Sequence, residues 1–189
     1  MTRPENHARN GFLARLVCAL PDALTLGRLL LSLTILALIL LRVREPGLAT
    51  ILYLVAWTTD IIDGKIARAM GIEGRMGKWD FPVDAFLAWA GAAYLAYLGF
   101  IHPGFFWGWT AIWALLAILT RNQAVVMLTE FAGIVACGVG MFSNARMWFW
   151  VCVAWIGLML ALDAPRFIAV VRGFIVNAAD FILPKRAQR

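Results

Sequence analysis

The chain has 189 residues, of which 62% are hydrophobic and only 15% are charged. A soluble domain of this size averages closer to half apolar and a quarter charged residues, so the composition excludes an ordinary soluble protein. The sequence contains 17 basic and 11 acidic residues, which give a net charge of +6. In a membrane protein such an excess reports topology and contact with anionic lipid, and no nucleic-acid-binding pattern accompanies it. The composition predicts an integral membrane protein.

Apolar stretches with few charges recur along the chain, which is typical of membrane-spanning helices. We expect an all-α integral membrane protein with six transmembrane helices and a short N-terminal interfacial helix. The predicted spans are 22–43, 47–69, 79–101, 104–121, 123–142 and 147–171. Proline and glycine turn signals and short charged stretches separate them. Residues 1–189 are therefore predicted to form one membrane domain, with its six-helix bundle at 22–171.

The two ends of the chain differ from the bundle in composition. Residues 1–20 carry an apolar stripe with Arg9 and Arg15 on another face, which is typical of an amphipathic helix in the membrane interface. Residues 172–189 form a basic tail. If six helices alternate, most basic residues fall on one side of the membrane, and the positive-inside rule makes that side cytoplasmic. We therefore expect both termini on the cytoplasmic side.

Four aspartates interrupt the apolar pattern, two near the end of the second predicted span and two near the start of the third. Asp60 and Asp63 are three residues apart, and Asp80 and Asp84 are four apart, so each pair shares a helix face. At about 1.5 Å of rise per residue, the two pairs overlap in depth near the cytoplasmic boundary. Carboxylates beside a bilayer core are costly and are read first as a functional site.

Four like charges in a partly dry place need a compensating cation. Mg²⁺ or Mn²⁺ suits carboxylate ligands, and two such ions would match four carboxylates. Gly64 and Ala67 continue the face of Asp60 and Asp63, which leaves a groove floored by small residues. Arg68 adds positive charge for a phosphate group. The combination predicts a site for a metal-bound diphosphate.

This pattern resembles the signature of the CDP-alcohol phosphotransferase (CDP-alcohol phosphatidyltransferase) family, D-x-x-D-G-x-x-A-R, eight residues, then G-x-x-x-D-x-x-x-D. The matching residues are Asp60, Asp63, Gly64, Ala67, Arg68 and Gly77, with Asp80 and Asp84 at their mutual spacing. Two residues separate Gly77 from Asp80, where the family has three. Residues 21–28 also resemble the P-N-x-L-T-x-x-R opening of the phosphatidylglycerophosphate synthase branch, with Asp22 in place of the asparagine.

The resemblance implies a membrane enzyme in which an alcohol attacks the β-phosphorus of a CDP-linked donor and CMP leaves. It implies that Asp60, Asp63, Asp80 and Asp84 hold two Mg²⁺ or Mn²⁺ ions, and that Asp84 is also the catalytic general base. It also implies that the CDP moiety is bound by Gly64, Ala67, Arg68 and Gly77. It further implies a homodimer in a membrane of the bacterial inner-membrane type. The positive-inside rule places the active site at the cytoplasmic face.

The acceptor alcohol is less constrained by the sequence. CDP-diacylglycerol is the expected donor and glycerol-3-phosphate the expected acceptor, with inositol phosphate, serine or another phospholipid as alternatives. Arg121 and Arg166 could contact a phosphate on the acceptor, or they could be basic flanks that reach the membrane interface. The same two readings apply to Arg28. A cation transporter is the alternative from another class, because acidic residues in apolar helices also mark ion pathways.

Overall fold

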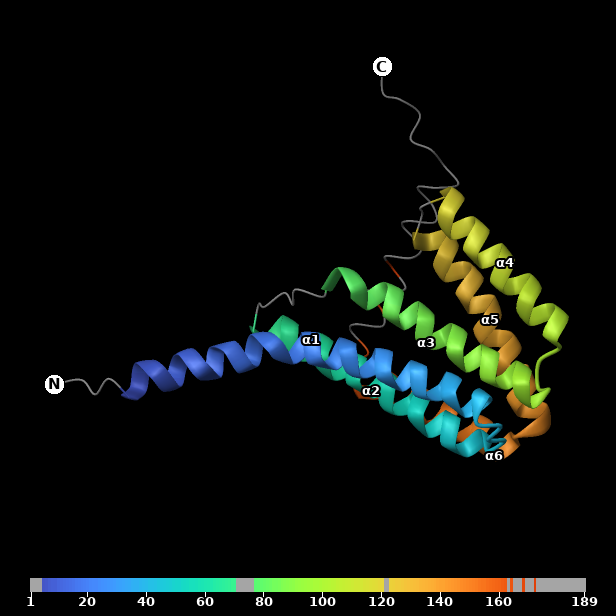
Figure 1. The fold of residues 1–189 in the computed structure, drawn as a ribbon, viewed down its shortest axis with the longest axis horizontal. Helices are drawn as coiled ribbons and strands as arrows, with labels where there is room; N and C mark the ends of the chain where they lie inside the picture. Colours follow the sequence, from blue (N-terminus) through green and yellow to red (C-terminus); the bar gives the residue numbers. More distant parts are fainter. Residues whose placement is uncertain are drawn as a thin grey trace, which may run out of the picture. The chain divides into compact units, whose positions relative to one another are not determined.

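A computed structural model describes residues 5–70, 77–120 and 123–162, together with residues 164, 168 and 172. The described residues form six α-helices (Figure 1). They are α1 (Glu5–Leu40), α2 (Pro46–Met70), α3 (Gly77–Leu98), α4 (Pro103–Thr120), α5 (Gln123–Asn144) and α6 (Arg146–Leu162). The prediction of an all-α protein with six helices in the bundle is confirmed. Helices α2 to α6 begin within two residues of the predicted spans.

Apolar stretches lie in all six helices, and they differ in length. Among the described residues, three stretches are long and apolar enough to cross a bilayer by themselves, namely Asp22–Leu40, Trp79–Leu98 and Pro103–Thr120. Shorter apolar stretches lie in the other helices, at Pro46–Ile62, Leu128–Asn144 and Arg146–Leu162. The C-terminal part of the last predicted span, 163–171, lies largely outside the described residues.

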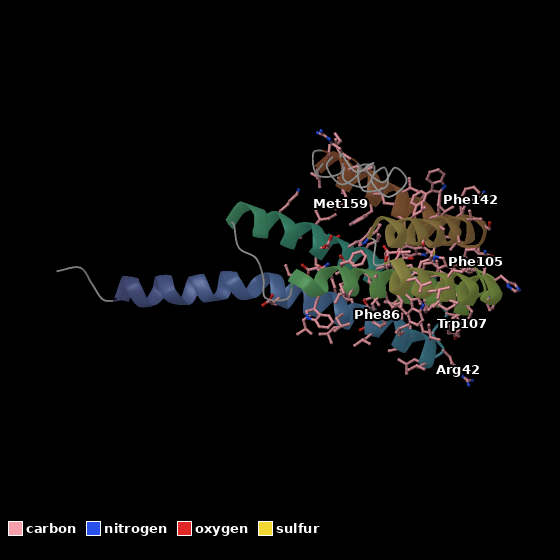
Figure 2. All side chains as sticks on the ribbon, turned by 90° about the horizontal axis from the view of Figure 1, so that it is seen from above. Arg42, Phe86, Phe105, Trp107, Phe142 and Met159 are labelled. Atoms are coloured by element: carbon pink, nitrogen blue, oxygen red, sulfur yellow. The ribbon has the colours of Figure 1, made fainter. Side chains whose placement is uncertain are left out.

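Large apolar side chains project outward from the helices. Figure 2 shows Phe105 and Trp107 on α4 and Phe142 on α5 among them. Trp107 is 63% exposed, and each of the six helices carries a leucine, isoleucine or tryptophan side chain that is at least as exposed as Ile51 of α2, at 49%. Such continuous apolar exposure would be unfavourable in water and is favourable against lipid chains. The helices therefore support an integral membrane protein.

The first helix begins earlier than the first predicted span. α1 continues without a break from Glu5 through Pro21 to Leu40. The expected short N-terminal helix and the first span are thus one element of 36 residues. The side chains of residues 5–21 lie outside the described part of the chain, so the interfacial location of this segment stays a prediction.

The predicted spans 22–43 and 79–101 are each three residues too long at the C-terminal end, because α1 ends at Leu40 and α3 ends at Leu98. Each helix closes instead with a left-handed residue, Arg42 with a φ of 55° and Gly99 with a φ of 82°. After α3, the Gly99 N–H donates to Ala96 O at 3.0 Å and the Phe100 N–H to Leu95 O at 2.9 Å. This is the Schellman arrangement, which satisfies the last carbonyls and turns the chain away from the helix axis.

The chain divides into two compact units, Met1–Tyr94 and Leu95–Arg189. In the first unit, α1 and α2 lie side by side (Figure 1). Helix α3 joins them through side chains, because the Tyr53 ring of α2 lies against Gly91. At one end of this unit the Tyr94 hydroxyl donates to Val43 O at 3.0 Å and accepts from the Glu45 N–H at 3.1 Å. Tyr94 is buried, so these bonds fix the α1–α2 connection to α3.

The second unit packs around a small apolar core. Leu95, Ile101 and Met141 are buried there, and aromatic and cysteine side chains of α5 and α6 pack against them. Gly140 of α5 lies directly against the backbone of Phe100, since a Cβ at residue 140 would lie 2.6 Å from the Phe100 carbonyl oxygen. A backbone atom cannot move aside as a flexible side chain can.

Replacing Gly140 with alanine should therefore destabilise the protein by about 1–3 kcal/mol, the usual penalty for overpacking. Thermal or denaturant-induced unfolding of the detergent-solubilised protein measures the change. Gly157→Ala in α6 is the matched control, because nothing lies within 4 Å of a Cβ at that position. The control should be neutral or slightly stabilising, since alanine favours helix more than glycine does. Equal stability of the two variants would contradict the close approach.

Candidate active site

The first unit brings together polar side chains from three helices. Thr25 and Arg28 come from α1, Asp60 from α2, and Asp80 and Asp84 from α3. Thr25 and Arg28 follow the polar N-terminal part of α1, Asp60 lies in the second half of α2, and Asp80 and Asp84 lie in the first turns of α3. This arrangement follows from the chain direction, because successive helices cross the membrane in opposite senses. The site therefore sits near one boundary of the apolar layer.

Arg28 is the centre of the site. Its Nη1 lies 2.7 Å from Asp60 Oδ1 and also contacts Asp84 Oδ1. Its Nη2 lies 3.3 Å from Asp80 Oδ1. The Arg28 side chain is 0% exposed. One guanidinium thus donates to three carboxylates on two neighbouring helices, which is the fork geometry that arginine provides and lysine lacks.

Thr25 stands one turn before Arg28 on the same face of α1. Its hydroxyl donates to Asp80 Oδ1 at 2.5 Å and lies 3.4 Å from Arg28 Nη2. Thr25 is 2% exposed, so its hydroxyl belongs to the protein interior and not to the lipid-facing surface. Asp80 is therefore held by two groups of α1.

The order of the contacts fixes the relative direction of the helices. Thr25 contacts Asp80. Arg28 lies three residues after Thr25 on α1, and it contacts Asp84, which lies four residues after Asp80 on α3. α1 and α3 therefore run parallel here. Arg28 Nη1 contacts Asp60 and Asp84 together, which puts these carboxylates at one depth although they are 24 positions apart in the sequence.

The charge of the cluster suits a divalent cation. Three aspartate side chains surround one guanidinium, so acidic groups outnumber basic ones in the cluster. The Asp60, Asp80 and Asp84 side chains are 26%, 43% and 36% exposed, so they are partly open while Arg28 is fully buried. Carboxylate oxygens are the ligands that Mg²⁺ and Mn²⁺ prefer. Within the described side chains, no three acidic, histidine or cysteine residues form a metal-binding group, and the guanidinium of Arg28 stands between the carboxylates.

Several predicted site residues are described only as backbone or not at all. Asp63, Gly64, Ala67 and Arg68 lie on α2, and Gly77 begins α3, but their side chains lie outside the described part of the chain. Arg121 and Arg166 lie wholly outside the described residues. Of the four predicted metal-binding aspartates, the structure thus brings together Asp60, Asp80 and Asp84.

The sequence reasoning missed Thr25 and left Arg28 between two readings. Of these, the interfacial one is wrong, because the Arg28 side chain is fully buried against the three aspartates. The signal that could have found both residues is the opening motif at 21–28. Thr25 and Arg28 are three residues apart there and share one helix face.

The fold and the site together define a helical membrane protein with an acidic polar centre at one boundary of its apolar layer. Residues 18–182 match the family model described as CDP-alcohol phosphatidyltransferase, and the chain belongs to this family. It is therefore a transferase of substituted phosphate groups. Enzymes of this family transfer such a group from a CDP-alcohol to an alcohol acceptor. The family is generally dependent on divalent metal ions. No curated protein and no solved structure gives a significant match.

The Thr25 hydroxyl can be tested as a support of the cluster. Thr25→Val keeps the shape of the side chain but removes the donor to Asp80, so the metal-free protein should lose about 1–3 kcal/mol of stability. Unfolding in the presence of a chelator measures the loss. Thr34→Val on the same helix is the matched control, since the exposed Thr34 hydroxyl bonds only to the backbone carbonyl of Leu30 in the same helix. A loss no larger than that of the control would contradict the role of Thr25.

Proposed function

We propose that the chain transfers the phosphatidyl group of CDP-diacylglycerol to glycerol-3-phosphate and releases CMP. The observation that carries the proposal is the convergence of Asp60, Asp80 and Asp84 on Arg28 in a member of this family. The lipid donor suits a site at the edge of an apolar layer, because its acyl chains can stay among lipids while its diphosphate reaches the carboxylates. The opening motif at 21–28 supports glycerol-3-phosphate as the acceptor.

The proposed metal ligands are Asp60, Asp63, Asp80 and Asp84, and two Mg²⁺ or Mn²⁺ ions would match them. When bound, such ions would neutralise charge on the diphosphate and on the departing CMP. Gly64, Ala67, Arg68 and Gly77 are proposed to bind the CDP moiety. Small residues allow the nucleotide to approach the α2 backbone, and Arg68 would donate to a phosphate oxygen.

Asp84 is the proposed general base. The acceptor hydroxyl oxygen forms a new bond to the β-phosphorus, and the bond from that phosphorus to the CMP oxygen breaks. Asp84 takes the hydroxyl proton in this step, so the nucleophile carries no positive charge as the bond forms. The Asp84 side chain is 36% exposed, which supports access by an acceptor, while its contact with Arg28 holds it in place.

The site is proposed to face the cytoplasm. The site lies toward the ends of α2 and α3 that are joined in the chain. Four basic residues surround this connection in the sequence, namely Lys65, Arg68, Arg75 and Lys78. The positive-inside rule places such a connection in the cytoplasm. Arg121 and Arg166 are proposed acceptor contacts, and a homodimer is proposed from the resemblance alone. The transporter alternative is set aside, because the family is one of transferases.

The reaction is tested by incubating purified protein with CDP-diacylglycerol, Mg²⁺ or Mn²⁺ and one acceptor at a time. CMP release is expected to require the metal ion and to be fastest with glycerol-3-phosphate. Inositol phosphate, serine and a phospholipid are the competing acceptors. Faster release with one of these would replace the acceptor, and no release with any of them would overturn the proposed reaction.

Asp84→Asn separates the base from the metal site. The amide cannot accept the proton, so the rate of CMP release should fall about 10²–10⁴-fold, the usual contribution of a general base. Binding of Mn²⁺ should be largely retained, because three aspartates remain. Glu45→Gln is the control for an acid-to-amide change, since this exposed residue lies outside the cluster. Near-normal turnover in Asp84→Asn would reject its role as base.

A further inference from the structure

We infer that the Arg28 side chain is itself the cation of the aspartate cluster and competes with a divalent metal ion for its carboxylates. The cluster consists of Asp60, Asp80 and Asp84. As the structure arranges them, these three carboxylates fit a guanidinium and do not fit a metal ion. The inference rests on the proposed function only for the choice of a divalent metal ion as the competitor. It makes Arg28 an internal restraint on metal loading.

Each carboxylate of the cluster directs an oxygen atom to the guanidinium. Asp60 Oδ1 lies 2.7 Å from Nη1, which Asp84 Oδ1 also contacts. Asp80 Oδ1 lies 3.3 Å from Nη2 and accepts a hydrogen bond from the Thr25 hydroxyl. Mg²⁺ takes its oxygen ligands at about 2.0–2.1 Å, so a shared ion needs one oxygen atom of each aspartate at that distance from a common point. The described side chains form no such metal-binding group of three, and their oxygen atoms converge on nitrogen instead.

Burial holds the guanidinium in this place. The Arg28 side chain is 0% exposed, while the aspartates are partly open. A buried charge is strongly unfavourable unless it is paired and hydrogen-bonded, so separating Arg28 from the carboxylates is costly. A metal ion that approaches the open side meets carboxylates that are already paired, with a positive charge behind them. Both effects lower the affinity of the cluster for the ion.

Binding of Mn²⁺ alone to the purified full chain, without donor or acceptor, tests the competition. Electron paramagnetic resonance of free Mn²⁺ gives the Kd for wild-type protein and for Arg28→Gln. The variant should bind Mn²⁺ about tenfold more tightly or better, because its aspartates have lost the neighbouring positive charge. Equal or weaker binding by Arg28→Gln overturns the inference.

Arg28→Lys tests whether the charge is what excludes the ion. Lysine keeps a positive charge on the same helix position, so the Kd for Mn²⁺ should stay within about threefold of the wild-type value. A Kd as low as that of Arg28→Gln would contradict competition between two cations.

Ser32→Ala is the matched structural control. Ser32 is buried one turn further along α1, and its hydroxyl donates to the Arg28 carbonyl oxygen at 2.8 Å. The change leaves the guanidinium in place, so the Kd for Mn²⁺ should equal that of wild type. Tightening of the same size as in Arg28→Gln would mean that any loosening of α1 favours the ion, which overturns a specific role for Arg28.

Thermal unfolding with and without Mn²⁺ provides a second readout. An ion that binds the folded state raises the unfolding temperature, and it does so more where its Kd is lower. Mn²⁺ should therefore stabilise Arg28→Gln more than wild type. If circular dichroism shows that Arg28→Gln does not fold in a chelator, Mn²⁺ should restore its folding by taking the place of the guanidinium. A variant that Mn²⁺ neither stabilises nor refolds overturns the inference.

The failures of the two proposals are distinguishable. Metal-dependent CMP release by wild-type protein, beside unchanged Mn²⁺ affinity in Arg28→Gln, would overturn only the competition. Tighter Mn²⁺ binding by Arg28→Gln, beside wild-type protein that releases no CMP with any acceptor, would support the competition and overturn the proposed reaction.

Discussion

A fully buried arginine bonded to carboxylates of two other helices is the interaction on which the first unit depends. Apolar helices in a bilayer gain little from hydrophobic contact with one another, because lipid chains are equally apolar. Polar contacts therefore have a large share in selecting which helix faces meet. Arg28 makes such contacts to Asp60, Asp80 and Asp84, so the same interaction selects the helix arrangement and assembles the polar centre.

The position of this centre along the helices links the fold to the chemistry. A diphosphate needs polar partners and water-accessible ions, while a diacylglycerol tail needs lipid. Both needs are met where apolar helix stretches end. In the sequence, Asp60 and Asp63 interrupt the apolar run of α2 ahead of Lys65 and Arg68, and Lys78 and Asp80 precede the apolar run of α3. The acids of this chain thus stand where a lipid-linked diphosphate could meet both lipid and polar groups.

The number of helices and their places in the sequence could be predicted, because apolar runs and the turn signals between them mark where helices begin and end. The convergence of the aspartates could be anticipated from helix rise and chain direction. The partner of those aspartates could not, since a lone arginine in an apolar helix either reaches the interface or pairs inward. That choice depends on which face of α1 meets its neighbours, which is tertiary information. The end of α1 was also missed, because Arg42 takes a left-handed conformation that usually marks glycine.

Tyr94 has a mechanical consequence for the site. Its hydroxyl is hydrogen-bonded to the backbone of Val43 and Glu45. Tyr94 lies ten residues after Asp84 on α3, which corresponds to about 15 Å along the helix axis. The three helices are thus joined at one end by neutral hydrogen bonds and at the other by charges. A shift of 1 Å at Asp84 then needs a rotation of α3 of only about 4° around the Tyr94 end. The Tyr94 hydrogen bonds therefore restrain the turning of α3, and with it the distance of Asp84 from Arg28.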